Sequence, residues 1–101
     1  MFAIYYSYRF TQLGVLHMRK FSEILEHFEG QSVRTYIFHK IYGDQESTVS
    51  NFCPLCSENK VGFVVNDNEV FMYFDEIESY EFNGSVFKLN GMLRNFIMEL
   101  I

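Results

Sequence analysis

The sequence has no apolar run of the roughly 18 to 20 residues that a membrane-spanning helix needs, because Tyr, Arg, Glu or Lys interrupts every hydrophobic stretch. It also lacks a basic amino-terminal region followed by a small-residue cleavage site, so we expect a cytoplasmic protein. No stretch rich in Pro, Gly or Ser marks a linker. These absences favour one domain covering residues 1–101, a length that closes around one hydrophobic core.

Motifs for catalysis are also missing. Neither G-x-G-x-x-G nor G-x-x-x-x-G-K-[ST] occurs, which argues against nucleotide hydrolysis. His17, His27 and His39 lie outside any motif that would pair a histidine with a Ser or Cys nucleophile. We expect His27 to face solvent and His39 to be a satisfied strand histidine. The sequence therefore predicts a protein that is not an enzyme.

Basic residues are scarce in the second half of the chain. Residues 1–40 carry five basic and three acidic side chains, whereas residues 41–101 carry three basic and ten acidic ones, and the formal net charge is −5. An extended phosphate-binding surface needs Lys and Arg, so this balance argues against direct nucleic-acid binding. A larger protein with a basic surface is the partner that the charge favours.

The acidic character is strongest between Val61 and Phe87, a window of 27 residues with six acids and no Lys or Arg. Aromatic residues alternate with the acids and can anchor a partner. The candidate partner-binding residues are Asp67, Glu69, Tyr73, Asp75, Glu76, Glu78, Tyr80 and Glu81. Charge reversal at Glu76 and Glu78 is then expected to slow association without disturbing the fold. A solvated sheet face is the alternative interpretation.

Aromatic residues are abundant, and the 12 Phe and 7 Tyr supply enough apolar area for a core. Phe21, Ile24, Leu25 and Phe28 have helical spacing, which predicts a helix over 18–29 with Gly30 at its C-cap. The same spacing of Leu93, Phe96, Ile97 and Leu100 predicts a closing helix over 91–100.

Alternation and turn residues predict the strands. The expected elements are a strand at 2–10, a turn near Gly14, a strand at 32–42, a polar loop at 43–51, a hairpin of 60–65 and 69–74 around Asn66-Asp67-Asn68, and a hairpin of 79–82 and 85–89 with a type I′ turn at Asn83-Gly84. The predicted fold class is α+β, a mostly antiparallel sheet with two helices in the approximate order β-α-β-β-β-β-β-α. We expect the helices to pack on one face of the sheet.

One local motif stands out. Asn51-Phe52-Cys53-Pro54-Leu55-Cys56-Ser57 contains C-P-x-C and resembles the knuckle of zinc ribbons and rubredoxin-like sites. The resemblance implies a tight turn that points Cys53 and Cys56 at one zinc ion, with two further ligands. The chain has no other cysteine, so histidines, carboxylates or the same knuckle in a homodimer would complete the site. Free thiols in a loop are the alternative, and a redox pair is a third; we expect no disulfide.

The leading hypothesis is a small, acidic, non-enzymatic protein-interaction module that binds a basic, nucleic-acid-handling partner. Small acidic inhibitors made by phages and mobile elements, including anti-CRISPR proteins, are similar in size and charge, which is an analogy of type without a shared motif. The alternative is a degenerate or dimer-completed zinc-knuckle protein that acts in transcription or nucleic-acid contact. Zinc is accordingly the one cofactor that the sequence suggests, and metal content separates the two hypotheses.

Overall fold

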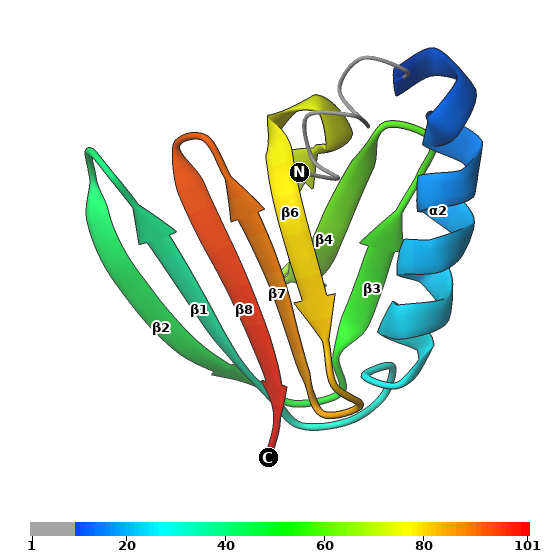
Figure 1. Cartoon of the computed structure of the whole chain (residues 1–101). Helices are drawn as coiled ribbons and strands as arrows, with labels where there is room; N and C mark the ends of the chain where they lie inside the picture. The colour runs from blue at the N-terminus through cyan, green and yellow to red at the C-terminus, as the bar shows by residue number, and fades with distance from the viewer. Residues whose placement is uncertain (1–9) are drawn as a thin grey trace.

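The computed structural model describes residues 10–101, with side chains from His17 onward, as one helix and eight strands in two antiparallel sheets (Figure 1). The elements are α2 Phe10–Glu26, β1 Val33–His39, β2 Gly43–Val49, β3 Cys53–Cys56, β4 Lys60–Val65, β5 Asn68–Tyr73, the 3₁₀ turn η1 Phe74–Glu76, β6 Ile77–Phe82, β7 Val86–Gly91 and β8 Arg94–Leu100. One sheet has the order β2-β1-β8-β7-β6 and the other β3-β4-β5. The predicted α+β class with antiparallel pairing is confirmed. The predicted element order and the single sheet are wrong, because the described range holds one helix instead of two, followed by eight strands in two sheets.

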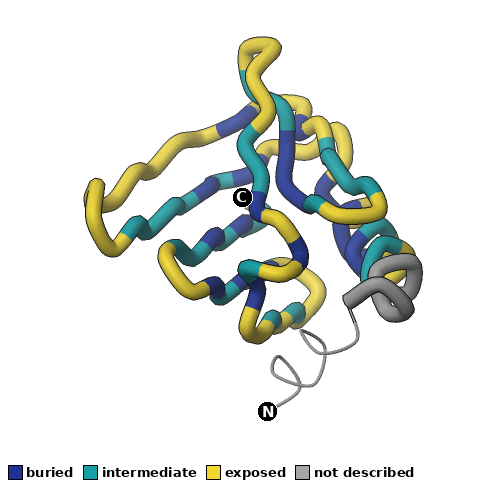
Figure 2. The backbone as a smooth tube through the Cα atoms, turned by 90° about the horizontal axis from the view of Figure 1, so that it is seen from above, coloured by how far each residue is buried: buried dark blue, intermediate teal, exposed yellow. Residues whose placement is uncertain are grey.

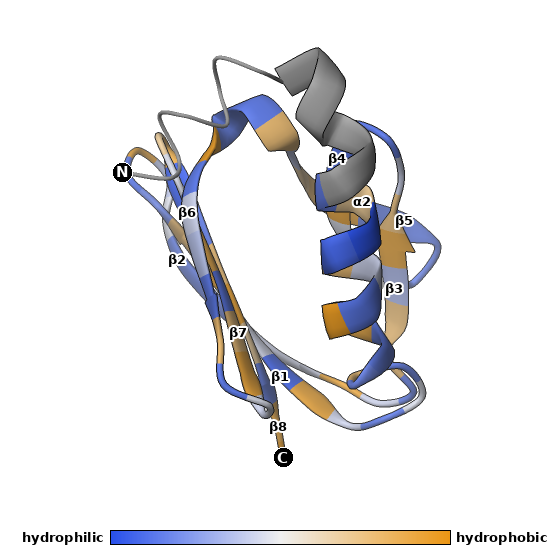
Figure 3. Cartoon of the chain, turned by 45° about the vertical axis from the view of Figure 1, so that its right-hand side comes forward, coloured by the Kyte–Doolittle hydropathy of each residue, from blue (hydrophilic) through white to orange (hydrophobic). Residues whose placement is uncertain are grey.

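The core lies between the two sheets and the helix. Both α2 and the three-stranded sheet lie on the same side of the five-stranded sheet (Figure 3). The Phe21 ring of α2 lies 5.8 Å from the Phe87 ring of β7, and the Phe63 ring of β4 lies 6.3 Å from the Phe96 ring of β8. Buried residues are interspersed with partly buried ones along the inner strands, whereas one edge strand and the hairpin loops are exposed (Figure 2). The opposite side of the five-stranded sheet is left uncovered by the described part of the chain.

The apolar residues that predicted the helix also pack it against the core. Phe21, Ile24, Leu25 and Phe28 are all buried, with Phe28 just beyond the end of α2. The helix begins at Phe10 and runs through Gly14, so the turn predicted there is wrong; one glycine in a helix costs about 1 kcal/mol relative to alanine, which a packed helix tolerates. The strand predicted at 2–10 lies outside the described residues, except for Phe10.

The closing helix predicted over 91–100 is wrong, because this segment forms β8. β8 lies between β1 and β7 and pairs with both, which satisfies its backbone groups on both edges. Phe96 and Met98 are buried while Ile97 between them is only partly buried. This is the alternation of a strand, so the segment fits a strand as well as the helical spacing. The helical spacing of the apolar residues was therefore coincidental, and Leu93 is in fact exposed.

The polar loop predicted at 43–51 is also wrong, since residues 43–49 form β2. Each residue of β2 is paired with β1, from Val33 opposite Val49 to His39 opposite Gly43. Only Val49 of this strand is buried. A strand exposed on both faces carries no hydrophobic alternation, so backbone pairing with β1 alone defines it.

Both predicted hairpins are present. Asn66 and Asp67 join β4 to β5 with positive φ angles of 51° and 64°, as a type I′ turn requires. In the β6–β7 hairpin the type I′ prediction is wrong, because Gly84 has a φ of 101° while Asn83 does not adopt a positive φ. The Asn83 side-chain oxygen instead accepts bonds from the amides of Ser85 and Val86, at 3.0 and 2.9 Å, and closes the loop.

Candidate functional site

The acids of the Val61–Phe87 window do not share one element or one sheet. Asp67 and Glu69 belong to the β4–β5 hairpin of the three-stranded sheet. The predicted site residues Asp75 and Glu76 lie in η1, and Glu78 and Glu81 lie on β6 of the five-stranded sheet. The window is contiguous in sequence, but its strands belong to two different sheets, so its charge is distributed around the molecule.

Two of these acids already have partners within the protein. The Glu76 carboxylate accepts a bond from the Tyr73 amide at 3.0 Å and lies 3.3 Å from the Arg94 guanidinium. Glu69 lies 2.9 Å from the Lys60 ammonium. Glu76 therefore holds η1 and β8 together, and a substitution there is expected to disturb the fold as well as any binding. This removes Glu76 from the residues suitable for testing charge steering alone.

The two candidate tyrosines differ in role. Tyr73 is exposed at the end of β5, with its ring 5.1 Å from that of Phe71. Tyr80 is partly buried and packs against the core, 5.0 Å from the Phe21 ring. Tyr80 therefore belongs to the packing between β6 and α2 and is poorly placed to contact a partner.

The C-P-x-C segment is a strand and not a tight turn. Cys53 and Cys56 are at the two ends of β3, and residues three apart in a strand lie on opposite faces. Both are free thiols, with Cys53 exposed. The Cys56 thiol donates a bond to the Met18 carbonyl oxygen at 3.4 Å, and burial raises its pKa. This geometry differs from a knuckle, in which both sulfurs face one ion.

The histidines do not complete a metal site with these cysteines, since the described residues contain no group of three or more His, Cys, Asp and Glu side chains arranged to hold an ion. His17 lies partly buried near the Phe21 ring, and burial lowers its pKa. His27 is exposed, as predicted. The Nδ1 atom of His39 accepts from the amides of residues 41 and 42, which confirms it as a satisfied strand-end histidine.

The uncovered face of the five-stranded sheet carries a pair of aromatic rings. Val33 and Thr35 of β1 are buried toward the core, so Tyr36 and Phe38 are directed to the opposite face. Their rings are parallel to within 3° at a centroid distance of 6.1 Å. Ile97 of β8 lies opposite Tyr36 on the same face and extends the apolar area.

Acidic residues border this aromatic pair. Asp44 is opposite Phe38 in the pairing of β1 with β2, and Glu46 is opposite Tyr36. Glu99 lies on β8 two residues beyond Ile97 and opposite Arg34 of β1. The Arg34 guanidinium lies 3.9 Å from the carboxylates of both Glu46 and Glu99. These long, exposed ion pairs hold the side chains only weakly, since exposed pairs are typically worth less than about 1 kcal/mol. We call Tyr36, Phe38, Ile97, Asp44, Glu46 and Glu99 the sheet face.

Two hairpin tips project at one end of this sheet. Ile41 and Tyr42 in the β1–β2 connection are 69% and 85% exposed, and Met92 and Leu93 in the β7–β8 connection are about half exposed. The Lys40 amide donates to the Leu93 carbonyl oxygen at 2.9 Å, so the tips are neighbours. Four of the six large exposed apolar side chains in the described range are thus gathered at one end of the five-stranded sheet.

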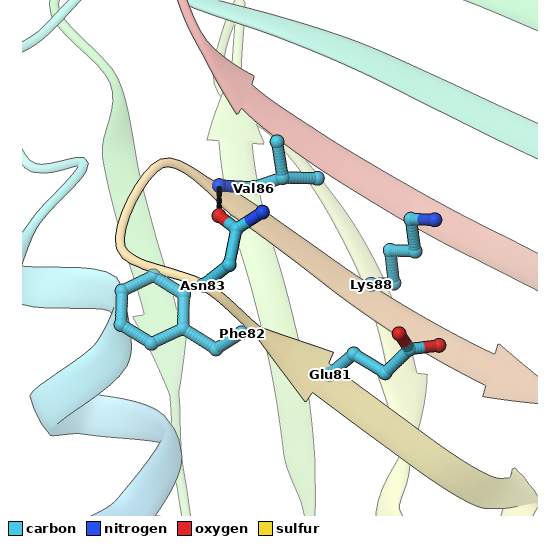
Figure 4. Close-up of a pocket in the computed structure, with 5 residues that line it drawn as sticks. All are labelled: Glu81, Phe82, Asn83, Val86 and Lys88. Carbon is cyan, nitrogen blue, oxygen red and sulfur yellow. Dashed lines mark hydrogen bonds between the residues drawn. The ribbon is translucent and has the colours of Figure 1, made fainter.

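Two hollows are lined entirely by residues that the structure describes in full. The β6–β7 hairpin has a surface hollow of about 140 Å³, which is lined by Glu81, Phe82, Asn83, Val86 and Lys88 (Figure 4). A groove of about 260 Å³ lies between α2 and β3, next to Cys56. Ligand pockets usually measure about 300 to 1,000 Å³, so both of these hollows are smaller than that range.

Comparisons with models of protein families, with characterised proteins and with solved structures gave no match to this chain. Within residues 10–101, the one helix is too short and too polar to cross a membrane.

The sequence contained a partial signal for the sheet face. The alternation in 32–42 places Tyr36 and Phe38 together on one side, but it does not reveal that this side is uncovered. Asp44 and Glu46 were missed because residues 43–51 were interpreted as a loop, where acidic residues indicate only solvent exposure.

Proposed function

We propose that this protein is a non-enzymatic module that binds a larger protein with a basic surface through the sheet face. The observation that carries the proposal is the parallel pair of Tyr36 and Phe38 on a side of the sheet that no described element covers. Burying these rings would contribute apolar contact area, and Asp44 and Glu46 beside them would supply the complementary charge.

The arrangement matches the general anatomy of protein interfaces. Binding energy concentrates in a few central aromatic side chains, and a polar rim sets orientation and specificity. Exposed acids act mainly on the rate of encounter, and salt screens them beyond about 8 to 10 Å. The remaining acids of the chain, such as Asp67 and Glu78, add to the net charge of −5 that attracts a basic partner.

A second aromatic pair is less suited to this role. Phe71 and Tyr73 lie on β5 of the three-stranded sheet. The Lys60 ammonium lies 4.5 Å from the centre of the Phe71 ring and is itself paired with Glu69. The Lys60–Glu69 contact at 2.9 Å is closer than the 3.9 Å contacts of Arg34 with Glu46 and Glu99, so the acid beside this second pair is less available to a basic surface.

The two more specific hypotheses from the sequence remain predictions. Inhibition of a nucleic-acid-handling partner is consistent with an acidic binding face, but it has no further support. The zinc-knuckle alternative retains its test by metal content, although Cys53 and Cys56 lie on opposite faces of β3.

The test compares two pairs of substitutions. Tyr36→Thr with Phe38→Thr should reduce the amount of partner captured from native host extract at least about tenfold, because truncating a hot-spot aromatic costs about 2 kcal/mol or more. Phe71→Thr with Tyr73→Thr is the matched control, since it removes one Tyr and one Phe two residues apart on another strand. Quantitative mass spectrometry measures the capture, and thermal unfolding checks that both variants fold.

The partner is then purified, and its association rate is measured against salt concentration. A rate that falls with added salt for the wild type supports the acidic rim. The proposal is overturned if the two variants lose the same proteins to the same extent, or if the Tyr36 and Phe38 variant binds the purified partner as the wild type does.

A further inference from the structure

The β2 strand is an open sheet edge whose only charged side chains, Asp44 and Glu46, are acidic. Its seven residues pair with β1 without a bulge, and its other edge has no neighbouring strand in the described part of the chain. Edge strands are commonly protected by proline, by charged side chains such as lysine, by a bulge or by a covering element. The β2 sequence Gly-Asp-Gln-Glu-Ser-Thr-Val contains neither proline nor lysine, and six of its residues are exposed. The strand is thus a ready template for a further strand.

The other three edges are less accessible. β3 has four residues, contains Pro54 and lies against α2. β6 has a register shift between Ile77 and Ser79, which interrupts a regular edge. β5 is regular but shorter than β2, and its only acid, Glu69, lies 2.9 Å from Lys60, closer than the 3.9 Å between Glu46 of β2 and Arg34. β2 therefore combines the longest regular edge with carboxylates facing the solvent.

The charges on β2 indicate which kind of strand would fit. Asp44 and Glu46 are two residues apart, so they project from the same face of the strand. Lys or Arg at alternate positions of an adjacent strand would lie opposite or diagonal to them, at a distance where unlike charges attract. A second copy fits less well, because symmetric antiparallel pairing of two β2 strands about their middle residue places two Glu46 side chains opposite each other.

We infer that β2 receives an extended segment of the partner as an added strand, and that this segment carries Lys or Arg at every second position. The inference rests on the proposed function and names the part of the partner that is recognised. Backbone hydrogen bonds along β2 would supply affinity, and the two carboxylates would select basic segments. Basic side chains on the added strand would lie on the same side of the sheet as Tyr36 and Phe38, which makes the edge and the sheet face one continuous surface.

The test uses a synthetic peptide of about nine residues in which lysine alternates with threonine, long enough at about 3.3 Å per residue to cover β2. Binding is measured by fluorescence anisotropy, and amide NMR signals identify the contact. We expect perturbation of the amides of residues 43–49 and slower hydrogen exchange on alternate residues of that strand. A second peptide has the same sequence with N-methyl groups on alternate backbone nitrogens, so its charge is unchanged but its strand edge cannot pair. We expect it to bind at least about tenfold more weakly.

Two protein variants provide the matched comparison. Asp44→Lys with Glu46→Lys should weaken peptide binding at least about tenfold, whereas Glu23→Lys with Glu58→Lys makes the same change in net charge at exposed sites away from β2 and should retain most of the affinity. Equal binding of the two peptides, or equal loss in the two variants, overturns the inference. Concentration-dependent self-association of the wild type that the β2 substitutions abolish also overturns it, since the occupant would then be a second copy.

These outcomes are separate from those of the proposed function. The N-methylated peptide is tested on the wild-type protein, so its result does not depend on whether any variant folds. If strand addition fails while the Tyr36 and Phe38 variant still loses the natural partner, the sheet face binds without β2. If the peptide pairs with β2 while that variant keeps the partner, strand addition stands on its own and the proposed sheet-face function fails.

Discussion

Replacing Gly62 by alanine should destabilise the protein more than any exposed substitution. Gly62 is a buried residue of β4, opposite Phe71 of β5. A methyl group at this position would overlap the Val70 carbonyl oxygen and would lie 2.7 Å from the Phe71 Cα atom. Both obstacles are backbone atoms, so a change of side-chain rotamer cannot make room. The β5 strand would have to move away from β4, which disturbs their six-pair ladder and the packing of the fully buried Met72.

Overpacking typically costs about 1 to 3 kcal/mol, and displacement of backbone puts Gly62→Ala at the upper end, about 3 kcal/mol. For a chain of this size each kcal/mol lowers the melting temperature by about 4 to 8 °C, so we expect a decrease of at least about 12 °C. Urea unfolding monitored by circular dichroism gives the free energy directly. Gly84→Ala is the control: its methyl group meets nothing within 4 Å, and only its φ of 101° is unfavourable. If Gly62→Ala lowers the free energy of unfolding no more than Gly84→Ala does, the argument that β5 lies too close to Gly62 for a methyl group is refuted.

Three further predictions follow from the buried and paired groups. Burial lowers the pKa of His17 below its ordinary 6.5, so the unfolded chain binds more protons than the folded protein. The contribution of neutral His17 to stability is complete above about pH 6.5 and is lost as the pH falls through the pKa of His17 in the folded protein. Unfolding free energies measured from pH 7 to 5 should therefore fall less steeply for His17→Phe than for the wild type, and equal slopes would contradict this. Glu76→Gln weakens the contact with Arg94 and should destabilise the protein by about 1 kcal/mol in urea unfolding, and the double variant with Arg94→Met should lose less than the sum of the two single changes. Iodoacetamide at neutral pH should modify Cys53 well before Cys56, because Cys56 is less accessible and has a raised pKa; equal rates by mass spectrometry would refute the placement of the two thiols.

The sequence predicted the elements whose signal is local and unambiguous. The helical stripe from Phe21 to Phe28 and the turn at Asn66-Asp67 were found because each pattern fits only one conformation well. The residues of β8 satisfy both helical spacing and strand alternation, and only their pairing with β1 and β7 decides between the two.

The candidate site was harder to predict, because a surface depends on tertiary arrangement. The run of acids from Asp67 to Glu81 is contiguous in sequence, but the chain passes from one sheet to the other within it. Asp44 and Glu46 belong to a strand whose formation depends on β1 and not on apolar residues of its own. Local patterns therefore identified the aromatic alternation of β1 and could not identify its neighbours.

The central position of β8 has a consequence for the order in which the five-stranded sheet can form. The β1–β2 hairpin and the meander of β6, β7 and β8 each join strands that are adjacent in sequence. The pairing of β1 with β8 is different, because it brings Val33 to Leu100 and closes a loop that contains the whole three-stranded sheet. Closing such a loop costs chain entropy before any contact is gained, and long-range strand pairing is slow for that reason. We expect the two local units to form first and to meet late, so that substitutions within the hairpins act mainly on the rate of folding and those at the β1–β8 contact act mainly on the rate of unfolding.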